Sequence, residues 1–168
     1  MRWSSQVVEM WALSHLFIMR HGQAEELAGR DRDRILTQDG RTQSLAMGRW
    51  LAEQPLPPAR ALVSPYVRAR QTFELVNQSL QLPAGQWSLL DDLTPHGSPE
   101  LVRDYLRAAV TSSNGSLLIV AHMPLVSFLV ELLDPTQVAP MFPTSAIAHL
   151  QNEAGQFGYR GLRVPEFD

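Results

Sequence analysis

The sequence predicts an α/β protein, a three-layer α/β/α sandwich around a mostly parallel, mixed sheet of about six strands. Short apolar runs alternate with longer amphipathic segments along most of the chain, which is typical of parallel strands joined by helices. Two further strand patterns stand together near the carboxyl end and indicate an antiparallel pair. The chain has 168 residues, 45% of them hydrophobic, which is enough for one domain with its own core.

The first predicted strand, residues 16–19, is the apolar run Leu-Phe-Ile-Met. A run without polar alternation is typical of a strand buried on both faces of a sheet. Arg20, His21 and Gly22 follow and emerge at its carboxyl end, the edge at which open α/β sheets bind ligands. A cation, an imidazole and a small residue there indicate an anion site, most simply for phosphate. The alternative is a strand that ends in a solvated turn.

A polar segment, residues 23–35, comes next, and its mixed charges predict a solvated loop. Asp31 and Asp33 form an Asp-x-Asp pair of the kind that aspartyl-phosphate phosphatases use at the end of a buried strand. No such strand precedes this pair, so we expect both carboxylates at the surface, in a loop with room to rim the site. Thr37 is a good helix N-cap, and the helix that it opens ends before Pro55.

Residues 61–63 predict a second short strand, and a Ser-Pro-Tyr turn leads into the next helix. Apolar residues recur at helical spacing from Ala69 onward and give this helix an amphipathic stripe. Arg68 lies in its first turn, where free N–H groups and the helix dipole attract anions and a guanidinium adds a bidentate donor. Ser64 either caps this helix or contacts phosphate through its backbone, and we favour the cap.

A third strand is predicted over residues 87–90, followed by a loop that holds Asp91 and Asp92 and by a helix with a Ser-Pro-Glu start. Residues 116–121 give the strongest strand pattern, and His122 follows directly. In the next helix, which Pro124 opens, we expect four apolar residues to face inward: Leu125, Phe128, Leu129 and Leu132.

The last strand patterns, residues 146–150 and 157–162, predict an antiparallel pair around a Glu-Ala-Gly turn. Two histidines are expected outside the anion site. His15 precedes the first strand and is expected to be exposed, whereas His149 lies in a late strand and is expected to be packed or hydrogen-bonded.

Composition excludes several classes of protein. The net charge of −3 gives no support to binding of nucleic acid or of an anionic membrane. The absence of cysteine excludes a structural disulfide, a cysteine nucleophile and a cysteine-based zinc site, and it fits the cytoplasm. No residues have metal-ligand spacing, and no phosphate-binding loop of the Walker type is present. We therefore expect neither a metal nor a cofactor.

Two parts of the chain are distinguished by their patterns. Residues 1–14 are a poor match to a signal peptide, and we expect either a disordered N-terminal arm or a mis-assigned start with Met10 as the true first residue. Residues 15–168 are expected to form a single domain.

Four side chains are predicted to converge at one sheet edge. His21 and His122 each follow a strand, Arg20 adjoins His21, and Arg68 opens a helix beside a strand end. Because the carboxyl ends of parallel strands lie on the same edge, these groups can surround one point. Two arginines and two histidines match the equatorial oxygens of a phosphoryl group and leave one imidazole free for in-line attack.

The motifs around these residues resemble those of the histidine phosphatase superfamily, whose fold is phosphoglycerate mutase-like. Order and spacing agree from Leu16 to Leu150, and the motifs are weak singly and strong together. They are Arg20-His21-Gly22, Leu36-Thr37-x-x-Gly40 with Gly48, Ser64-Pro65-x-x-x-Arg68-Ala69-x-Gln71-Thr72, and Ala121-His122.

Within the superfamily the chain is most similar to the short SixA-type phosphohistidine phosphatases. It lacks the long insertions that cap the site in mutases and in many small-molecule phosphatases, and an open site suits a substrate carried on a protein surface. The shared segments are residues 17–22, Leu93-Thr94-Pro95, His122-x-Pro124-Leu125-Val126, and residues 140–148.

The resemblance implies a phosphatase of phosphorelay signalling in which His21 becomes transiently phosphorylated, without a metal or a cofactor. Arg20, Arg68 and His122, with Gly22, would hold the phosphoryl group. The implied partner is a histidine-containing phosphotransfer protein or another phosphocarrier, and the implied state is a monomer. Two alternatives stay open: a phosphatase of small phosphate esters, and a non-catalytic phosphoprotein-binding module.

A general acid is the least defined part of the implied site. Larger members of the superfamily carry an acidic residue in the loop after the third strand, and Asp92 is the nearest candidate, with Asp91 next. A solvent-facing or capping aspartate is the competing interpretation. A phosphohistidine substrate expels an imidazole, a better leaving group than an alkoxide, so acid assistance matters less.

Overall fold

The structure is a computed structural model that describes residues 13–26, 29–109 and 115–166. Residues 1–12 of the expected N-terminal arm lie outside the described part. Leu13 and Ser14 already belong to the fold, because Leu13 is buried and the Ser14 N–H donates to the Gly115 carbonyl over 2.8 Å. No helix among the described residues has the length and the apolar character that a membrane crossing requires.

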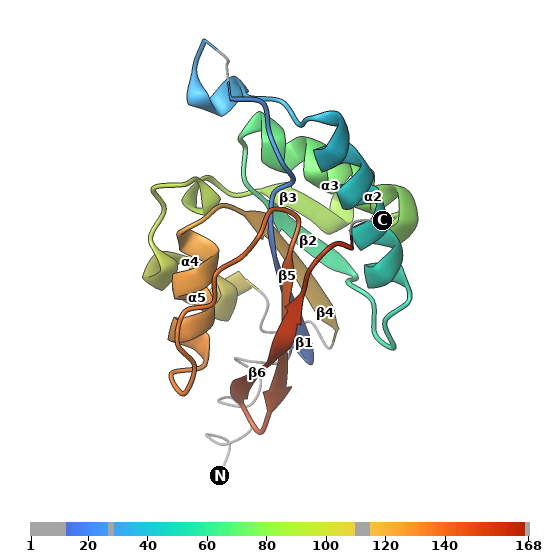
Figure 1. The fold of residues 1–168 in the computed structure, drawn as a ribbon. Coiled ribbons are helices and arrows are strands. Elements are labelled where there is room, and N and C mark those ends of the chain that lie inside the picture. The colour runs from blue at the N-terminus through green and yellow to red at the C-terminus, as the bar shows by residue number, and fades with distance from the viewer. Residues whose placement is uncertain (1–12, 27–28, 110–114, 167–168) are drawn as a thin grey trace.

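A six-stranded mixed sheet runs through the middle of the molecule in the order β3-β2-β4-β1-β5-β6 (Figure 1). The first four of these are parallel to one another, and the last two are antiparallel to their neighbours. The strands are β1 (His15–Arg20), β2 (Arg60–Val63), β3 (Trp87–Leu89), β4 (Ser116–Ala121), β5 (Ile147–Glu153) and β6 (Gln156–Arg163).

Helices cover both faces of this sheet (Figure 1), which confirms the predicted three-layer sandwich. One face carries α2 (Gln38–Ala52) and α3 (Val67–Leu80), and the other carries α4 (Pro99–Ala109) and α5 (Leu125–Leu133). In the described connections, single 3-10 turns are η1 (Asp31–Asp33), η2 (Ala84–Gln86) and η3 (Asp91–Leu93).

β1 shows how one apolar run serves two cores. Leu16 and Ile18 join the cluster of buried residues beneath α4 and α5, whereas Phe17 and Met19 join the cluster beneath α2 and α3. Successive side chains of a strand point to opposite faces, so a central strand must be apolar at every position. Because its side chains are buried on both faces, β1 is held in place, and the position of its last residue at the sheet edge is fixed.

Local signals in α2 act as the sequence predicts. The Thr37 hydroxyl accepts a hydrogen bond from the Gly40 N–H over 3.0 Å and caps the helix. At Gly48 an added Cβ would lie 2.8 Å from Cα of Val76 in α3. Only glycine lets these two helices approach so closely, and their contact fixes α3 relative to the sheet.

The prediction for α5 is partly wrong. Leu125 and Leu129 are buried as expected and Leu132 is half-buried, but Phe128 is 51% exposed. Nearly every residue of this helix is apolar, so its periodicity does not distinguish the inner face from the outer one. Packing against the sheet makes the choice and leaves the phenylalanine outside.

His15 is the second correction. It is half-buried in β1 rather than exposed, and its Nδ1 lies 2.8 Å from Nε2 of His149. The rings stack with centroids 5.0 Å apart, and His149 also stacks on Phe17. The prediction that His149 is packed or hydrogen-bonded is confirmed.

Candidate active site

His21 lies at the carboxyl end of β1 and is only 6% exposed. Its backbone continues the sheet pairing, because its N–H donates to the Ala121 carbonyl over 3.0 Å. The ring Nδ1 lies 2.7 Å from the Gly22 carbonyl oxygen. A carbonyl can only accept, so Nδ1 carries the proton and Nε2 of the neutral ring carries the lone pair. The imidazole is therefore held in the tautomer that a nucleophilic Nε2 requires.

Arg68 stands in the first turn of α3 and is buried against this imidazole. Its Nε donates to His21 Nε2 over 3.3 Å. Its two terminal nitrogens both contact Asp31: Nη1 donates to the Asp31 carbonyl over 2.8 Å, and Nη2 donates to the carboxylate over 3.2 Å. The outer end of the guanidinium is thus occupied by Asp31, while Nε faces the nucleophile.

His122 follows β4, the strand beside β1, and its ring centroid lies 5.0 Å from that of His21. Its Nε2 lies 2.7 Å from the Ser64 hydroxyl, and its Nδ1 is buried with no hydrogen-bond partner in the part of the chain that the structure describes. The expectation that Ser64 caps α3 is wrong. Tyr66 occupies the N-cap position, and the serine hydroxyl contacts His122 and accepts a hydrogen bond from the Tyr66 N–H over 3.3 Å.

Arg20 is the last residue of β1 and directly precedes His21. Its Nη1 donates to the Phe142 carbonyl over 2.8 Å, and its Nε is buried without a hydrogen-bond partner among the described residues. Burial, together with the charge of Arg68, lowers the pKa of this guanidinium. Buried donors without partners are uncommon in folded proteins. Arg20 Nε and His122 Nδ1 are therefore groups that an incoming oxyanion can satisfy.

Gly22 keeps the backbone tight behind the nucleophile. Its N–H donates to the Thr72 hydroxyl over 2.9 Å. An added Cβ would lie 2.8 Å from the Ser44 hydroxyl and 2.9 Å from the Gly40 carbonyl, so a larger residue would displace α2. Its carbonyl oxygen is the one that lies 2.7 Å from Nδ1 of His21.

The electrostatics of the site keep both imidazoles neutral. Burial, reinforced by the charges of Arg68 and Arg20, lowers the pKa of His21 to about 3. Burial, with His21 and Arg68 adding to it, lowers the pKa of His122 to about 2, while the Asp31 charge acts in the opposite direction. Positive donors around neutral rings favour an anion, and an anion would in turn raise both pKa values.

The two carboxylates of the Asp-x-Asp pair, in the loop before α2, have different partners. Asp33 pairs with Arg30 over 3.1 Å at the surface, as expected. Asp31 is more than half exposed, yet it contacts Arg68 and also accepts from Arg34 Nη1 over 3.0 Å. The sequence pattern does not predict this contact. The nearby Leu36-Thr37 motif fixes the end of the loop, but only the folded chain brings η1 to α3.

Asp91 and Asp92 lie in η3, directly after β3 and at the same edge of the sheet. Within the part of the chain that the structure describes, no hydrogen bond or ion pair joins the Asp92 side chain to His21, Arg20, Arg68 or His122. A role for Asp92 as an acid stays a prediction. Across the same described residues, no group of three or more His, Asp or Glu side chains is arranged to hold a metal ion.

Comparison with known proteins places these residues in a family context. The model of the histidine phosphatase superfamily (branch 1) matches residues 16–95. Phosphohistidine phosphatase SixA of Escherichia coli (strain K12) is 45% identical over 133 residues, which cover 79% of this chain and 82% of the relative. A SixA homolog of Haemophilus influenzae is 38% identical over 142 residues, covering 81% and 87%.

Solved structures agree with this similarity. A structure of the protein histidine phosphatase SixA complexed with tungstate superimposes with a TM-score of 0.82 at 42% identity, covering 88% of this chain and 95% of that one. A phosphoglycerate mutase from Bacillus anthracis superimposes with a TM-score of 0.69 at 15% identity, covering 88% and 91%. At that low identity the second match shows the shared fold alone.

Proposed function

The chain belongs to the histidine phosphatase superfamily, and from that premise we propose that it hydrolyses phosphohistidine on a protein through a phosphorylated His21. Its relatives in E. coli and H. influenzae carry the name phosphohistidine phosphatase SixA or SixA homolog. The related SixA structure holds tungstate, an oxyanion like phosphate. A phosphatase with a histidine nucleophile needs one free imidazole nitrogen surrounded by fixed positive donors.

The observation that carries this proposal is the environment of His21 Nε2. The proton of the ring is committed to the Gly22 carbonyl, and Arg68 Nε stands 3.3 Å from the opposite nitrogen. The guanidinium of Arg68 attracts a phosphoryl oxygen of the substrate. The lone pair of the neighbouring His21 nitrogen is then directed at phosphorus. The arginine thus positions the phosphoryl group for in-line attack.

In the first step, the Nε2 lone pair of His21 forms a bond to phosphorus as the N–P bond of the substrate breaks. The departing imidazole takes that electron pair and leaves neutral when its other nitrogen bears a proton. Arg20, Arg68 and His122 stabilise the equatorial oxygens, and a phosphoryl dianion favours a protonated His122. Because this leaving group needs little protonation, the step does not depend on Asp92.

In the second step, a water molecule forms a bond to phosphorus and the N–P bond to His21 breaks. The electron pair returns to Nε2, and the proton lost by water stays on the released phosphate. The Nδ1–H bond to Gly22 keeps the phosphorylated ring positively charged, which makes it a good leaving group. The same arginines stabilise both transition states, so one set of donors serves the whole cycle.

We assign Asp31 a positioning role within this mechanism. It holds both terminal nitrogens of Arg68, and this contact keeps the Nε side of the guanidinium toward His21. Arg34 in turn holds the Asp31 carboxylate, so the loop supports Arg68 through paired charges. A guanidinium fixed before substrate arrives loses less conformational freedom on binding.

The substrate protein, the oligomeric state and the location of the enzyme belong to the same proposal. We propose a histidine-containing phosphotransfer protein or similar phosphocarrier as the partner, a monomeric enzyme, and action in the cytoplasm. The open sheet edge, which no long insertion caps, supports a substrate presented on a folded surface. A small phosphate ester would gain little binding energy outside its phosphoryl group.

The test follows the phosphoryl group. A phosphotransfer domain labelled on histidine with ³²P should lose its label to inorganic phosphate with catalytic amounts of the wild-type protein. Acid-labile label should appear on the enzyme in rapid-quench samples and be absent from His21→Ala. Efficient, saturable turnover of a phosphate monoester without turnover of the labelled domain would contradict the proposal.

A further inference from the structure

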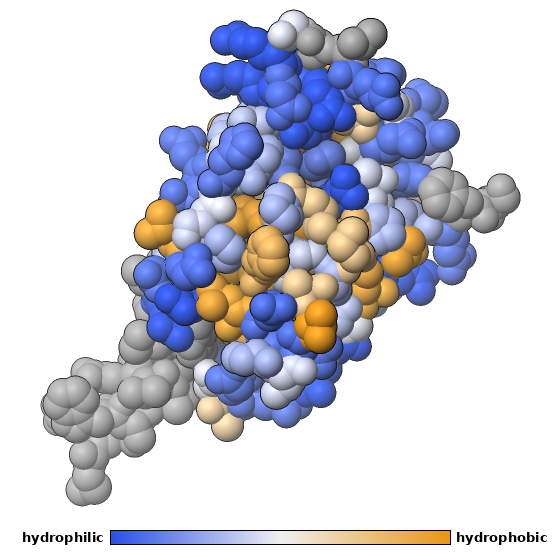
Figure 2. Space-filling view, turned by 60° about the vertical axis from the view of Figure 1, so that its left-hand side comes forward, coloured by the Kyte–Doolittle hydropathy of each residue, from blue (hydrophilic) through white to orange (hydrophobic). Residues whose placement is uncertain are grey.

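An apolar surface adjoins the candidate active site, on the side of α5 and the loop that follows it, residues 134–146. Phe128 on α5 is 51% exposed, and Val138 and Met141 in the loop are 86% and 78% exposed. Figure 2 shows apolar residues gathered across the middle of this side of the molecule, with hydrophilic residues above and below. Exposed apolar side chains grouped in this way mark interaction sites in folded proteins.

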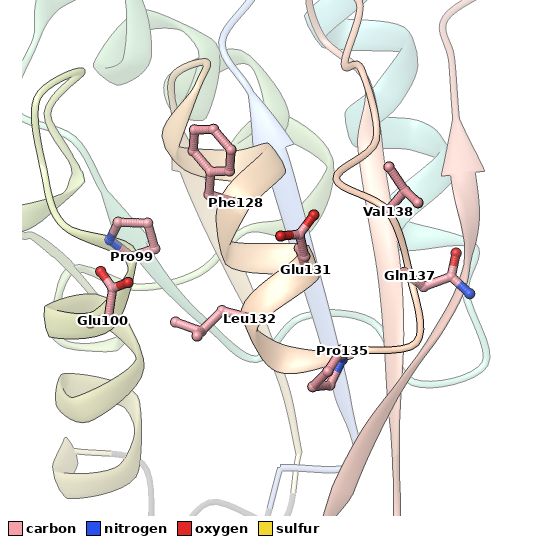
Figure 3. A pocket seen from close by; sticks show the side chains of 8 residues that line it. All are labelled: Pro99, Glu100, Phe128, Glu131, Leu132, Pro135, Gln137 and Val138. Carbon is pink, nitrogen blue, oxygen red and sulfur yellow. The ribbon is translucent and has the colours of Figure 1, made fainter.

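A groove of about 540 Å³ runs through this surface between α4, α5 and the loop. Figure 3 shows the aromatic ring of Phe128 and the side chain of Val138 on either side of Glu131, with Glu100 and Pro99 across the groove on α4. Leu132 and Pro135 line it as well. The groove is therefore apolar along its walls and carries two carboxylates.

The surface is held in place rather than loose. The Ala139 N–H donates to the Glu131 carboxylate over 2.9 Å, and the Ser127 hydroxyl donates to the Pro140 carbonyl. These bonds fasten the loop that carries Val138 and Met141 to α5, the helix that carries Phe128. A surface that is already ordered loses little conformational entropy when a partner binds.

The same segment builds one wall of the candidate active site. His122 is directly followed by the turn into α5, and its carbonyl accepts from the Val126 N–H over 3.0 Å. Phe142, the neighbour of Met141, supplies the carbonyl that holds Arg20. Phe128 lies about 6 Å along the helix from Pro124, given a rise of 1.5 Å per residue. The apolar surface is thus continuous with the edge of the site.

Because the apolar surface is continuous with the edge of the site, a protein that binds at the site can also cover this surface. A phosphohistidine side chain extends only about 6 Å from its backbone, so a protein that offers one to His21 must bring its own surface to the rim. A specific interface buries about 800 Å² on each partner, a disc of about 16 Å radius, which extends well beyond the rim. A partner centred on His21 therefore lies over α5 and the loop.

We infer that Phe128, Val138 and Met141, with the adjoining groove, form the docking surface for the protein that carries the phosphohistidine. This inference rests on the proposed function and adds the part of the partner that is recognised. The groove between two helices fits a helix with apolar residues on one face, and Glu100 and Glu131 fit a basic residue on it. Aromatic and methionine side chains are well suited to such contacts.

The test compares two substrates of one chemistry: a histidine-phosphorylated phosphotransfer domain and free phosphohistidine. Phe128→Glu and Met141→Glu, alone and together, should raise KM for the domain at least about tenfold, because each places a charge in an apolar contact. Turnover of free phosphohistidine should stay within about twofold of wild type. Leu56→Glu is the matched control, since Leu56 is also exposed but precedes β2 at the opposite sheet edge.

The possible outcomes test the docking surface and the proposed function separately. Unchanged KM for the domain in all variants, or equal losses on both substrates, would overturn the docking surface and leave the proposed function standing. Wild-type protein that turns over free phosphohistidine but not the domain would refute the protein substrate itself. Self-association of the wild type in sedimentation, abolished by Phe128→Glu, would assign the surface to a second copy of the chain and overturn the inference.

Discussion

A histidine pair lies near each end of β1, and the two pairs differ in chemistry although their rings are equally close. His21 and His122 have ring centroids 5.0 Å apart at the carboxyl edge of the sheet, and His15 and His149 have the same separation near the other end. In the second pair, the two rings hydrogen-bond to each other and stack. Proximity of two imidazoles alone therefore does not make a reactive site.

What separates the pairs is the use of each ring nitrogen. His21 Nδ1 is bound by a backbone carbonyl, and its Nε2 faces Arg68. In the other pair, His15 Nδ1 and His149 Nε2 are used on each other. Burial lowers the pKa of all four rings, so a lowered pKa does not distinguish a reactive pair from a structural one either. The fixed guanidinium that faces the lone pair of His21 Nε2 does.

The largest expected effect comes from exchanging one histidine of each pair. His21→Ala should lower kcat/KM for phosphoprotein by at least about 1,000-fold, because loss of a nucleophile removes the covalent route. His149→Ala should leave kcat/KM within about twofold. Steady-state phosphate release measures both variants, and comparable losses would contradict the contrast between the two pairs.

Removal of a single donor to the phosphoryl group should have the next largest effect. Arg68→Ala and His122→Ala should each lower kcat by about 100- to 1,000-fold, the usual result of losing one preorganised donor. The covalent route survives in both variants. Rapid-quench samples should therefore still contain some phosphoenzyme, and its complete loss in Arg68→Ala would instead make this arginine indispensable to nucleophilic attack.

The two aspartates of the loop give a smaller contrast. Asp31→Asn weakens a hydrogen bond to a charged group that is partly screened by solvent, so we expect kcat to fall about fivefold to tenfold. KM for free phosphohistidine should change less than kcat if Asp31 acts by aiming Arg68. Asp33→Asn is the matched control, because the ion pair that the described residues show for Asp33 is with Arg30 and not with Arg68. Equal kcat values for the two variants would remove Asp31 from the mechanism.

The smallest expected effect is on stability. Burial and the His15 charge lower the pKa of His149 to about 4, against about 6.5 in an unfolded chain. As pH falls from 6.5 toward 4, the unfolded chain gains a proton that the folded chain does not, so the free energy of unfolding decreases. His149→Phe should reduce this decrease by about 1 kcal/mol, after allowance for solvent screening. Urea unfolding at pH 7 and pH 5 measures the difference.

The sequence predicts the fold and the candidate positions at the sheet edge because both depend on local patterns. The run from Leu16 to Met19 must be a buried strand, so Arg20 and His21 must leave the sheet at its end. Thr37 caps its helix through its own hydroxyl. The strand and helix patterns already place these positions at the sheet edge. The family motifs then indicate the function of the residues there.

The remaining contacts depend on how distant segments meet. His15 pairs with Gln151 across β1 and β5, and the diagonal neighbour on that strand is His149, which only the register brings into reach. Asp31 reaches Arg68 because the Leu36 N–H is fastened to Gln71 on α3. Phe128 is outside because an almost wholly apolar helix leaves the choice of face to packing. None of these has a local signature.

The carbonyl of Gly22 has a consequence for the isomer of the covalent intermediate. With Nδ1 engaged by that oxygen at 2.7 Å, phosphorus can bond only to the nitrogen remote from the side-chain stem. The enzyme would pass through tele-phosphohistidine and never through the pros isomer. A single backbone oxygen would thereby set the regiochemistry of a group that, in free histidine, reacts at either nitrogen.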